Sequence, residues 1–397
     1  MKLNEVCLNI VDCPHSTAPD EGSGYALIRT PNIGKGRFNL EGIHRISEEA
    51  YKKRCARITP TVNDLILARE APAGNVAIIK ENMEPLALGQ RTVLIRPNPE
   101  KVNPEYLVYY LLAPKQQNEL LGRATGATVA HVNIPIINNL PVSLPTLETQ
   151  KKIAGILSAY DDLIENNHKQ IKLLEEAAQK LYKEWFVKLN FPGHENTKIV
   201  DGVPEGWINE RIGKLFKTVL GGTPSRKRKD FWENGTIPWI NSGKVNELRI
   251  IEPSEYITEL ALNKSATKLL PKHTVLIAIT GATLGQVSYT EIETCANQSV
   301  VGIIDEKEQY SSYLYCNIFT NIQSIITKAT GGAQQHINKD IVDNHKLLLP
   351  SANIIELFNK SINPIFNKIT ILLKQNQLIQ SALDKLLPKL MNGDLDV

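Results

Sequence analysis

Few side chains in this sequence have the type and spacing that catalysis or metal binding requires. No Pro-Pro pair occurs, so the (D/N/S)-P-P-(Y/F/W) tetrapeptide of an N6-adenine methyltransferase is absent, and no G-x-x-x-x-G-K-[ST] phosphate-binding loop is present. The eight histidines show no H-x-x-x-H spacing, which a helical metal site would need. Ser242, His131 and Asp64 could be combined into a triad, but scattered residues of these types occur in any chain of this length. The sequence therefore predicts no catalytic residue and no metal ligand.

Polar loops offer a different chemistry, because Arg, Asn and Gln can form paired hydrogen bonds to base edges, whereas Lys and hydroxyl groups contact phosphates. In the first half of the chain, such residues share one loop after a predicted strand or flank neighbouring strands: Arg29, Thr30, Asn32, Lys35, Arg37, Arg69 and Arg91. The second half contains the only run of four basic residues and repeats the first loop's position: Arg226, Lys227, Arg228 and Lys229, then Asn241, Ser242 and Lys244. These residues are the candidate DNA-binding set. A solvated charged loop is the alternative interpretation of the basic run.

The elements around these loops predict a mixed α/β domain over residues 1–145. Short apolar runs indicate strands at Tyr25–Arg29, Asp64–Ala68, Asn75–Ile79 and Thr92–Ile95. Helical patterns indicate helices at Ser47–Cys55 and Glu105–Leu121. Residues 191–205 show no periodicity, and we interpret them as a linker.

A second copy of the domain is predicted over residues 206–350. Residues 330–350 match residues 125–145 at eight of 21 positions at one fixed offset, beginning with Thr125-Gly126 and Thr330-Gly331. The motif His-x-Asn recurs at His131 and at His336 within this match. It could contact a phosphate at the junction of domain and helix, or its polar side chains could cap a structural turn. The match predicts a tandem repeat in the chain.

Each copy is followed by a long predicted helix, at residues 146–190 and 351–397, and Thr146 is the expected N-cap of the first. Apolar residues recur at steps of three and four, which is typical of a coiled-coil seam. The seam residues are Leu157, Tyr160, Ile164, Asn167, Ile171 and Leu174 in the first helix, and Ile365, Ile369, Leu372, Asn376, Ile379 and Leu383 in the second. We therefore predict an α+β protein in which a long antiparallel two-helix coiled coil separates two mixed α/β domains in a pseudo-two-fold tandem repeat.

Several residues of these helices leave alternatives open. Asn167 and Asn376 could face each other and fix the register of the pair, or could simply be exposed to solvent. Pro364 and Pro388 should remove backbone hydrogen bonds and kink or restart the second helix. The aromatic group Tyr182, Trp185 and Phe186 could pack in a domain core or could bind a partner.

Composition limits the class of protein. A chain of 397 residues with 42% apolar and 22% charged residues fits a soluble protein of two domains. The net charge is only +3, so DNA binding would need local basic surfaces or basic partners. The five cysteines form no C-x-x-C pair, which suits a reducing compartment. With no signal-like start and no apolar run of about 18 residues, we expect a cytoplasmic protein.

Four stretches carry a resemblance to a known family. They are Ala177–Val187 followed by Phe191-Pro192-Gly193; Val203–Trp207 with Gly222–Ser225 and Trp232–Trp239; Pro145–Asp161; and Leu386–Gly393. In their order along the chain they resemble the DNA-specificity (S) subunit of a type I restriction–modification system, and the resemblance covers nearly the whole chain.

The resemblance implies that the two mixed α/β domains, residues 1–145 and 206–350, are target recognition domains, and that each reads one half of a bipartite double-stranded DNA target. The helices would then set the spacer and bind two modification (methyltransferase) subunits, with two restriction subunits able to join. It also implies a chain with no catalysis and no cofactor of its own, S-adenosylmethionine and ATP/Mg being held by partner subunits. The alternative is a coiled-coil scaffold that joins two ligand-binding domains without nucleic acid.

Overall fold

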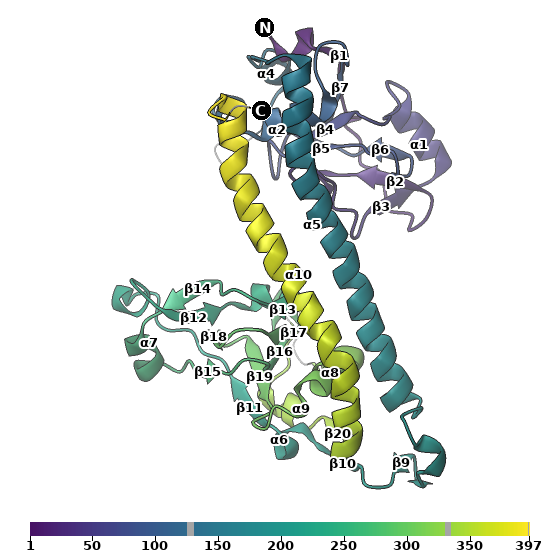
Figure 1. The fold of residues 1–397 in the computed structure, drawn as a ribbon, viewed down its shortest axis with the longest axis vertical. Coiled ribbons are helices and arrows are strands. Elements are labelled where there is room, and N and C mark those ends of the chain that lie inside the picture. The colour runs from purple at the N-terminus through teal and green to yellow at the C-terminus, as the bar shows by residue number, and fades with distance from the viewer. Residues whose placement is uncertain (125–130, 330–334, 396) are drawn as a thin grey trace. The chain divides into compact units, whose positions relative to one another are not determined.

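The computed structural model describes residues 1–124, 131–329, 335–395 and 397 (Figure 1). Thr125-Gly126 and Thr330-Gly331 of the predicted repeat lie outside these residues. The chain forms two compact units, one from residues 1–166 with 377–397 and the other from residues 167–376. Both contain mixed sheets and helices, so the fold is α+β.

The first unit contains a four-stranded antiparallel sheet and a smaller three-stranded sheet. The larger sheet has the order β1-β7-β4-β5, with β1 at Cys7–Asp12, β4 at Leu65–Ala68, β5 at Val76–Ile78 and β7 at Thr92–Pro97. The smaller has the order β3-β2-β6, with β2 at Tyr25–Ile28, β3 at His44–Ile46 and β6 at Leu86–Leu88. Strand β2 pairs parallel with β6 and antiparallel with β3.

The helices of this unit are α1 at Glu48–Cys55, α2 at Pro104–Leu112, α3 at Pro114–Leu121 and α4 at Ile134–Asn138. The side chain of Asn103 caps α2, because its Oδ1 accepts a hydrogen bond from the backbone N–H of Tyr106 at 2.9 Å. The single helix predicted from Glu105 to Leu121 is wrong. Pro114 forces Ala113 into an extended conformation, so α2 ends there and α3 starts anew.

The second unit contains a five-stranded sheet, a four-stranded sheet and two short two-stranded ones. The five-stranded order is β11-β19-β16-β17-β13, with β11 at Lys217–Leu220, β13 at Arg249–Ile250, β16 at Val275–Ala278, β17 at Val287–Thr290 and β19 at Val300–Ile304. The four-stranded order is β14-β12-β18-β15, with β12 at Ile237–Ile240, β14 at Glu255–Ile257, β15 at Leu269–Leu270 and β18 at Thr294–Ala296. The short sheets pair β10 (Ile208–Arg211) with β20 (Lys346–Leu349), and β8 (Ile199–Val200) with β9 (Val203–Pro204). Helices are α6 at Ile212–Leu215, α7 at Glu259–Lys264, α8 at Ser311–Ile326 and α9 at Lys339–Asp343.

The two units repeat one topology. The order β1-β7-β4-β5 of the first recurs as β11-β19-β16-β17 in the second, and β3-β2-β6 recurs as β14-β12-β18. The pairing senses agree as well, because β2 with β6 and β12 with β18 are both parallel pairs. Each pattern is followed by a helix against the larger sheet, α2 and α8 respectively. The duplication predicted from sequence is therefore present in the strand order.

Two long helices complete the structure: α5 at Leu147–Tyr182, extended by a π-helical turn at Lys183–Val187, and α10 at Ala352–Asn392. Thr146 caps α5 as predicted, since its Oγ1 accepts a hydrogen bond from the N–H of Thr149 at 3.2 Å. The predicted restart of α10 is wrong, because one continuous helix contains both Pro364 and Pro388. Pro364 lies on the exposed side, where water can bind the carbonyl that loses its intrahelical donor.

Within each unit the long helices contact each other through the predicted seam, all twelve residues of which are buried or half-buried. In the first unit Leu157 shares a core with Leu383. In the second, Ile171 clusters with Ile369 and Leu372, and further along α5 the Trp185 ring lies 5.7 Å from that of Phe358. Because positions later in α5 meet positions earlier in α10, the two segments of the second unit run antiparallel.

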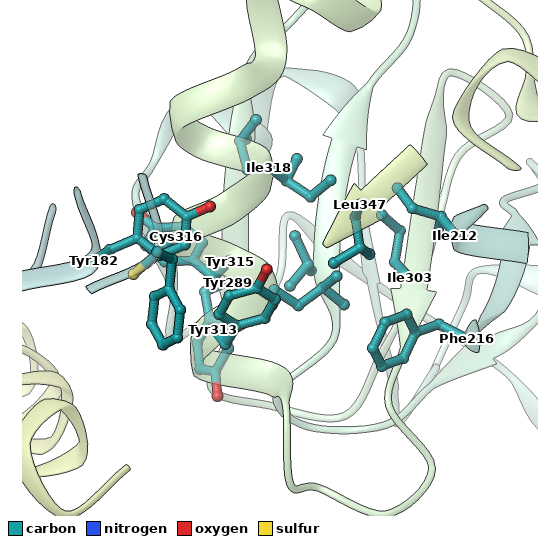
Figure 2. Packing of buried hydrophobic residues seen from close by; sticks show 14 of the residues in the cluster. Tyr182, Ile212, Phe216, Tyr289, Ile303, Tyr313, Tyr315, Cys316, Ile318 and Leu347 are labelled. Carbon is teal, nitrogen blue, oxygen red and sulfur yellow. The ribbon is translucent and has the colours of Figure 1, made fainter. Parts of the chain in front are cut away.

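Aromatic residues dominate the core of the second unit. Tyr182 and Phe186 at the end of α5 pack with Tyr313 of α8, and Figure 2 shows Tyr182 beside Cys316 and the tyrosines of this cluster. The core-packing interpretation of this aromatic group is therefore confirmed. Residues 191–205 are also more structured than a linker, because Phe191 is buried with its ring 5.0 Å from that of Trp207, and the β8–β9 hairpin follows.

Candidate nucleic-acid interface

The loop after β2 places its polar residues in an ordered turn. Arg29 precedes a 3₁₀ turn at Thr30–Asn32, and its backbone N–H donates to Oδ1 of Asn32 at 3.1 Å. The Nδ2 of Asn32 donates to the carbonyl of Asn39, so this amide is only 3% exposed and shapes the loop. Thr30 is buried and Arg29 is half-buried, whereas Lys35 is exposed. Of the candidates on this loop, Lys35 is the one most open to a ligand.

The loop after β12 lies at the same topological position in the second unit. Asn241 precedes a 3₁₀ turn at Ser242–Asn246, and its Oδ1 accepts a hydrogen bond from the N–H of Lys244 at 3.1 Å. Asn241 is exposed, and Ser242 is half-buried. The Nζ of Lys244 is bound by two carboxylates, Glu247 at 2.8 Å and Glu252 at 3.2 Å. The loop therefore presents amide and hydroxyl groups, while its lysine is neutralised within the domain.

Arg37 and Arg69 are held inside the first unit. Arg37 donates from its Nη2 to Oδ1 of Asp162 on α5 at 2.8 Å, and its side chain is largely buried. Arg69 is 6% exposed and donates to both carboxylate oxygens of Asp12, at 2.8 and 2.9 Å, and to the carbonyl of Val132 at 2.8 Å. Donors that already bind carboxylate or carbonyl oxygens of the same unit are not available to base edges. We therefore assign both residues to the internal structure of the unit.

Arg91 and His131 border the same cluster. The Nε of Arg91 lies 2.9 Å from a carboxylate oxygen of Glu70, but most of its side chain is exposed. The Nδ1 of His131 contacts a carboxylate oxygen of Glu70, and its Nε2 lies 2.7 Å from the Nη2 of Arg69. In the other repeat, Asn338 caps α9 by accepting from the N–H of Ile341 at 2.9 Å. These contacts favour the structural interpretation of the His-x-Asn motif.

The basic run divides into arginines that have ion-pair partners and lysines for which the described part of the chain provides none. Arg226 forms two 2.6 Å hydrogen bonds with Glu255, and its guanidinium lies 3.5 Å from the ring centre of Trp232. Arg228 pairs with Asp230 and lies over Phe231. Lys227 and Lys229 are exposed, and among the described residues neither has an ion-pair partner. Two free ammonium groups on one loop can neutralise phosphates without specifying a base.

One buried cation was missed by the sequence reasoning. Arg249 of β13 has a fully buried side chain, and its Nη2 lies 3.0 Å from Oε1 of Glu175 on α5. Burial raises the pKa of Glu175, and the charge of Arg249 opposes that rise. No sequence signal marks this pair, because 74 residues separate its members and Arg249 lies in a strand of only two residues.

Chemistry other than binding has little support in the described residues. No group of three or more His, Cys, Asp or Glu side chains among them could hold a metal ion. None of the helices in the described part of the chain combines the length and apolar character of a membrane span. The buried thiols of Cys13, Cys295 and Cys316 have raised pKa values because burial disfavours the thiolate. What the candidate residues can do is donate hydrogen bonds and neutralise phosphates.

Comparison with known proteins identifies the family. A family model described as the type I restriction modification DNA specificity domain matches the chain twice, over residues 1–176 and 204–383. The chain belongs to this family. Its two matches coincide with the two repeats of domain and long helix, so the type I DNA-specificity architecture accounts for the duplicated topology.

Individual relatives agree with this assignment. The type I restriction enzyme MjaIX specificity subunit of Methanocaldococcus jannaschii is 30% identical over 367 residues, which cover 90% of this chain and 83% of that protein. The HindI specificity subunit of Haemophilus influenzae is 23% identical, over 93% of this chain and 94% of that protein. Among solved structures, the type I restriction–modification S subunit from M. genitalium is similar with a TM-score of 0.58 at 16% identity, covering 98% of this chain and 95% of that one. This last likeness concerns the fold.

Proposed function

We propose that this DNA-specificity protein reads a bipartite DNA target, each recognition domain contacting one half of it. The two long helices form an antiparallel coiled coil that holds the two domains in a pseudo-two-fold arrangement and sets the unspecified gap. The recognition domains correspond to residues 1–145 and 206–350, and the helices to 146–190 and 351–397. The chain performs no bond chemistry, and S-adenosylmethionine and ATP/Mg are bound by its partners.

The observation that carries this proposal is the repetition of one polar loop at one place in two domains. Arg29 and Asn241 follow equivalent strands, and each begins a 3₁₀ turn. The residues differ between the loops, as expected if each domain reads different bases with the same scaffold. Lys35 in one domain, and Lys227 with Lys229 in the other, are exposed cations suited to phosphate contact.

Seam contacts support the pseudo-two-fold arrangement. The repeat offset read from the matching segments is 205 residues, which relates Asn167 to Leu372 and Ile171 to Asn376. Asn167 donates to Oδ1 of Asn376 at 2.8 Å, and Ile171 shares a cluster with Leu372. Replacing each residue by its counterpart in the other repeat therefore converts the Asn167–Asn376 contact into the Leu372–Ile171 contact. A two-fold axis between the helices requires this relation.

The outer faces of the long helices are the proposed binding sites for two modification subunits. Exposed large apolar residues recur on both helices: Ile156, Leu163 and Leu173 on α5, and Leu357, Ile371 and Leu378 on α10. Ile156 and Leu163, like Ile371 and Leu378, are seven residues apart and so share a face of their helix. Apolar residues repeated along a solvent-facing stripe are typical of a helix that packs against a partner.

The proposal is tested by footprinting the chain together with its modification subunit on DNA, in the presence of S-adenosylmethionine. The salt concentration should be low and fixed, because affinity for DNA phosphates falls steeply as salt increases. Mapping of methylated adenines in the host genome should then return one motif with two short specified halves around a fixed gap. Protection of no DNA would instead support a scaffold for two ligand-binding domains.

A domain exchange tests whether the halves are read separately. Replacing residues 206–350 with those of a related subunit should change one half of the methylated motif and leave the other half and the gap as they were. A change in both halves would contradict independent reading. Methyl transfer by the isolated chain would contradict its assignment as a non-catalytic subunit.

A further inference from the structure

The side chain of Arg249 occupies an aromatic cage within the second unit. Its guanidinium carbon lies 3.8 Å from the ring centre of Phe366 on α10, 4.5 Å from that of Tyr315 on α8 and 4.8 Å from that of Tyr289 on β17. Glu175 on α5 supplies the opposing charge at 3.0 Å. One side chain of the recognition domain thus contacts both long helices and two other elements of the unit.

The pair is poorly arranged for stability alone. Although Nη2 of Arg249 and Oε1 of Glu175 lie 3.0 Å apart, neither these two atoms nor the other guanidinium nitrogens form a well-oriented hydrogen bond with any described residue. The hydroxyl of Tyr315 donates to the other carboxylate oxygen, Oε2, at 3.5 Å. Burying two charges is costly, and apolar residues of similar volume are often as stable or more stable in such a place. A buried charge pair can instead favour one orientation of the elements it joins, which apolar contacts do not specify.

A cation occupies the equivalent position of the first domain. The N–H of Tyr289 donates to the carbonyl of Leu248, directly before Arg249, and the N–H of Ile78 donates to the carbonyl of Gly36, directly before Arg37. Ile78 and Tyr289 hold matching places in β5 and β17, since they pair with the first residues of β4 and β16.

Arg37 also binds a carboxylate of α5, because it donates to Asp162 at 2.8 Å. Next to it, the hydroxyl of Tyr109 donates to Asp161 at 2.6 Å. Each repeat therefore connects its recognition domain to a long helix through an arginine at one topological position. The recurrence of the contact with different partner residues points to a shared role.

We propose that the Arg249–Glu175 pair is a positioning device, which fixes the orientation of the second recognition domain on the long helices and thereby the gap between half-sites that the complex accepts. The recognition domain meets the helices here through β13, a strand of two residues, which by itself constrains the contact weakly. Stacking in the cage and attraction to Glu175 define one direction for the guanidinium plane. This inference rests on the proposed bipartite reading.

The test compares Arg249→Met, Glu175→Met and the double variant, each assembled with modification subunits. Substrates are duplexes that carry both halves of the mapped motif around the natural gap, or around a gap one base pair shorter or longer. We expect the double variant to match wild type in melting temperature but to lose at least about tenfold in preference for the natural gap, roughly 1.4 kcal/mol of discrimination. Each single variant should melt lower, since it leaves one charge buried alone.

Arg96→Met is the matched control. Arg96 binds the buried carboxylate of Asp64 at 2.7 Å, but both residues lie within the first recognition domain. This variant should lose stability and keep the natural gap preference. If a Met variant fails to fold, Arg249→Lys, which keeps the charge but not the planar group, should lower the gap preference in its place.

The outcomes separate the two proposals. A folded double variant, or a folded Arg249→Lys, with unchanged gap preference would overturn the positioning role while leaving bipartite reading intact. Wild-type complex that methylates every gap equally, or recognises one half alone, would overturn the bipartite reading itself.

Discussion

The hydrogen bond between Asn167 and Asn376 in the helix seam allows a quantitative test of the pairing. Both side chains are buried, and the Nδ2 of Asn167 donates to Oδ1 of Asn376 at 2.8 Å. Replacing Asn167 by Leu leaves that oxygen without its donor, while the Nδ2 of Asn376 already has no acceptor among the residues that the structure describes. An unsatisfied buried polar group costs about 1–3 kcal/mol, and a leucine at position 167 recovers little of this cost because it faces the remaining amide of Asn376 rather than an apolar side chain. We therefore expect Asn167→Leu to lower the free energy of unfolding by about 1–2 kcal/mol.

The double variant with Leu at both positions should behave differently. It removes both amides and leaves an apolar seam beside Ile171 and Leu372, so its stability should equal or exceed that of wild type. The double-mutant cycle should accordingly give a coupling energy of roughly 1–3 kcal/mol.

The assay is urea unfolding of the purified chain followed by circular dichroism, with Gln375→Leu as the control on the exposed face of α10. That control should stay within about 0.5 kcal/mol of wild type. Single substitutions whose effects simply add in the double variant would refute the reasoning, because they would show that the two amides do not depend on each other.

Three further predictions concern other contacts. Gly36→Ala should cost about 1–3 kcal/mol in thermal melts, because Gly36 has φ of +89° and a Cβ would lie 2.9 Å from Oδ2 of Asp161. An equal loss in Gly42→Ala, where no atom of the described residues lies within 4 Å of the added Cβ, would exclude the contact as the cause. Replacing Lys227 and Lys229 by Gln should weaken binding uniformly across DNA sequences and reduce the salt slope by about 2, measured by fluorescence anisotropy; a loss confined to the target would contradict phosphate contact. Burial raises the pKa of Glu175 above its ordinary value of 4.5. The protonated carboxyl group therefore contributes its full stability below pH 4.5, and this contribution is lost as pH rises through the raised pKa. The difference in melting temperature between Glu175→Gln and wild type should therefore shift in favour of the variant as pH rises from 4 to 7. A shift in favour of wild type would mean that the charge of Arg249 outweighs burial and brings the pKa of Glu175 below its ordinary value.

The elements that the sequence predicts well are those with a strong apolar period. The inner strands β4 and β16 are runs of buried apolar residues, and the seam of α5 and α10 follows the steps of three and four. Strand β1 at Cys7–Asp12 was missed because its side chains are exposed or half-buried, so no alternating pattern marks it. The effect of Pro364 was misjudged because its exposure, which makes the lost hydrogen bond tolerable, is a property of the folded helix pair.

The candidate interface was less predictable than the fold, for a physical reason. Whether a basic side chain is free depends on carboxylates far away in sequence, such as Glu255 for Arg226 or Asp162 for Arg37. Residue type and loop position identify all of these residues as possible donors. Only the tertiary contacts separate Arg69, which is buried, from Lys35, which is exposed.

The composition of the first unit has a consequence for synthesis of the chain. Leu383 and Leu390 of α10 fill part of the core that contains Tyr106 and Leu107, yet the ribosome makes them after the whole of residues 167–376. The domain translated first can therefore complete its core only after the other unit has emerged, and its apolar face stays uncovered during that interval. A stop codon near residue 377 would harm the early-made domain more than the late-made one.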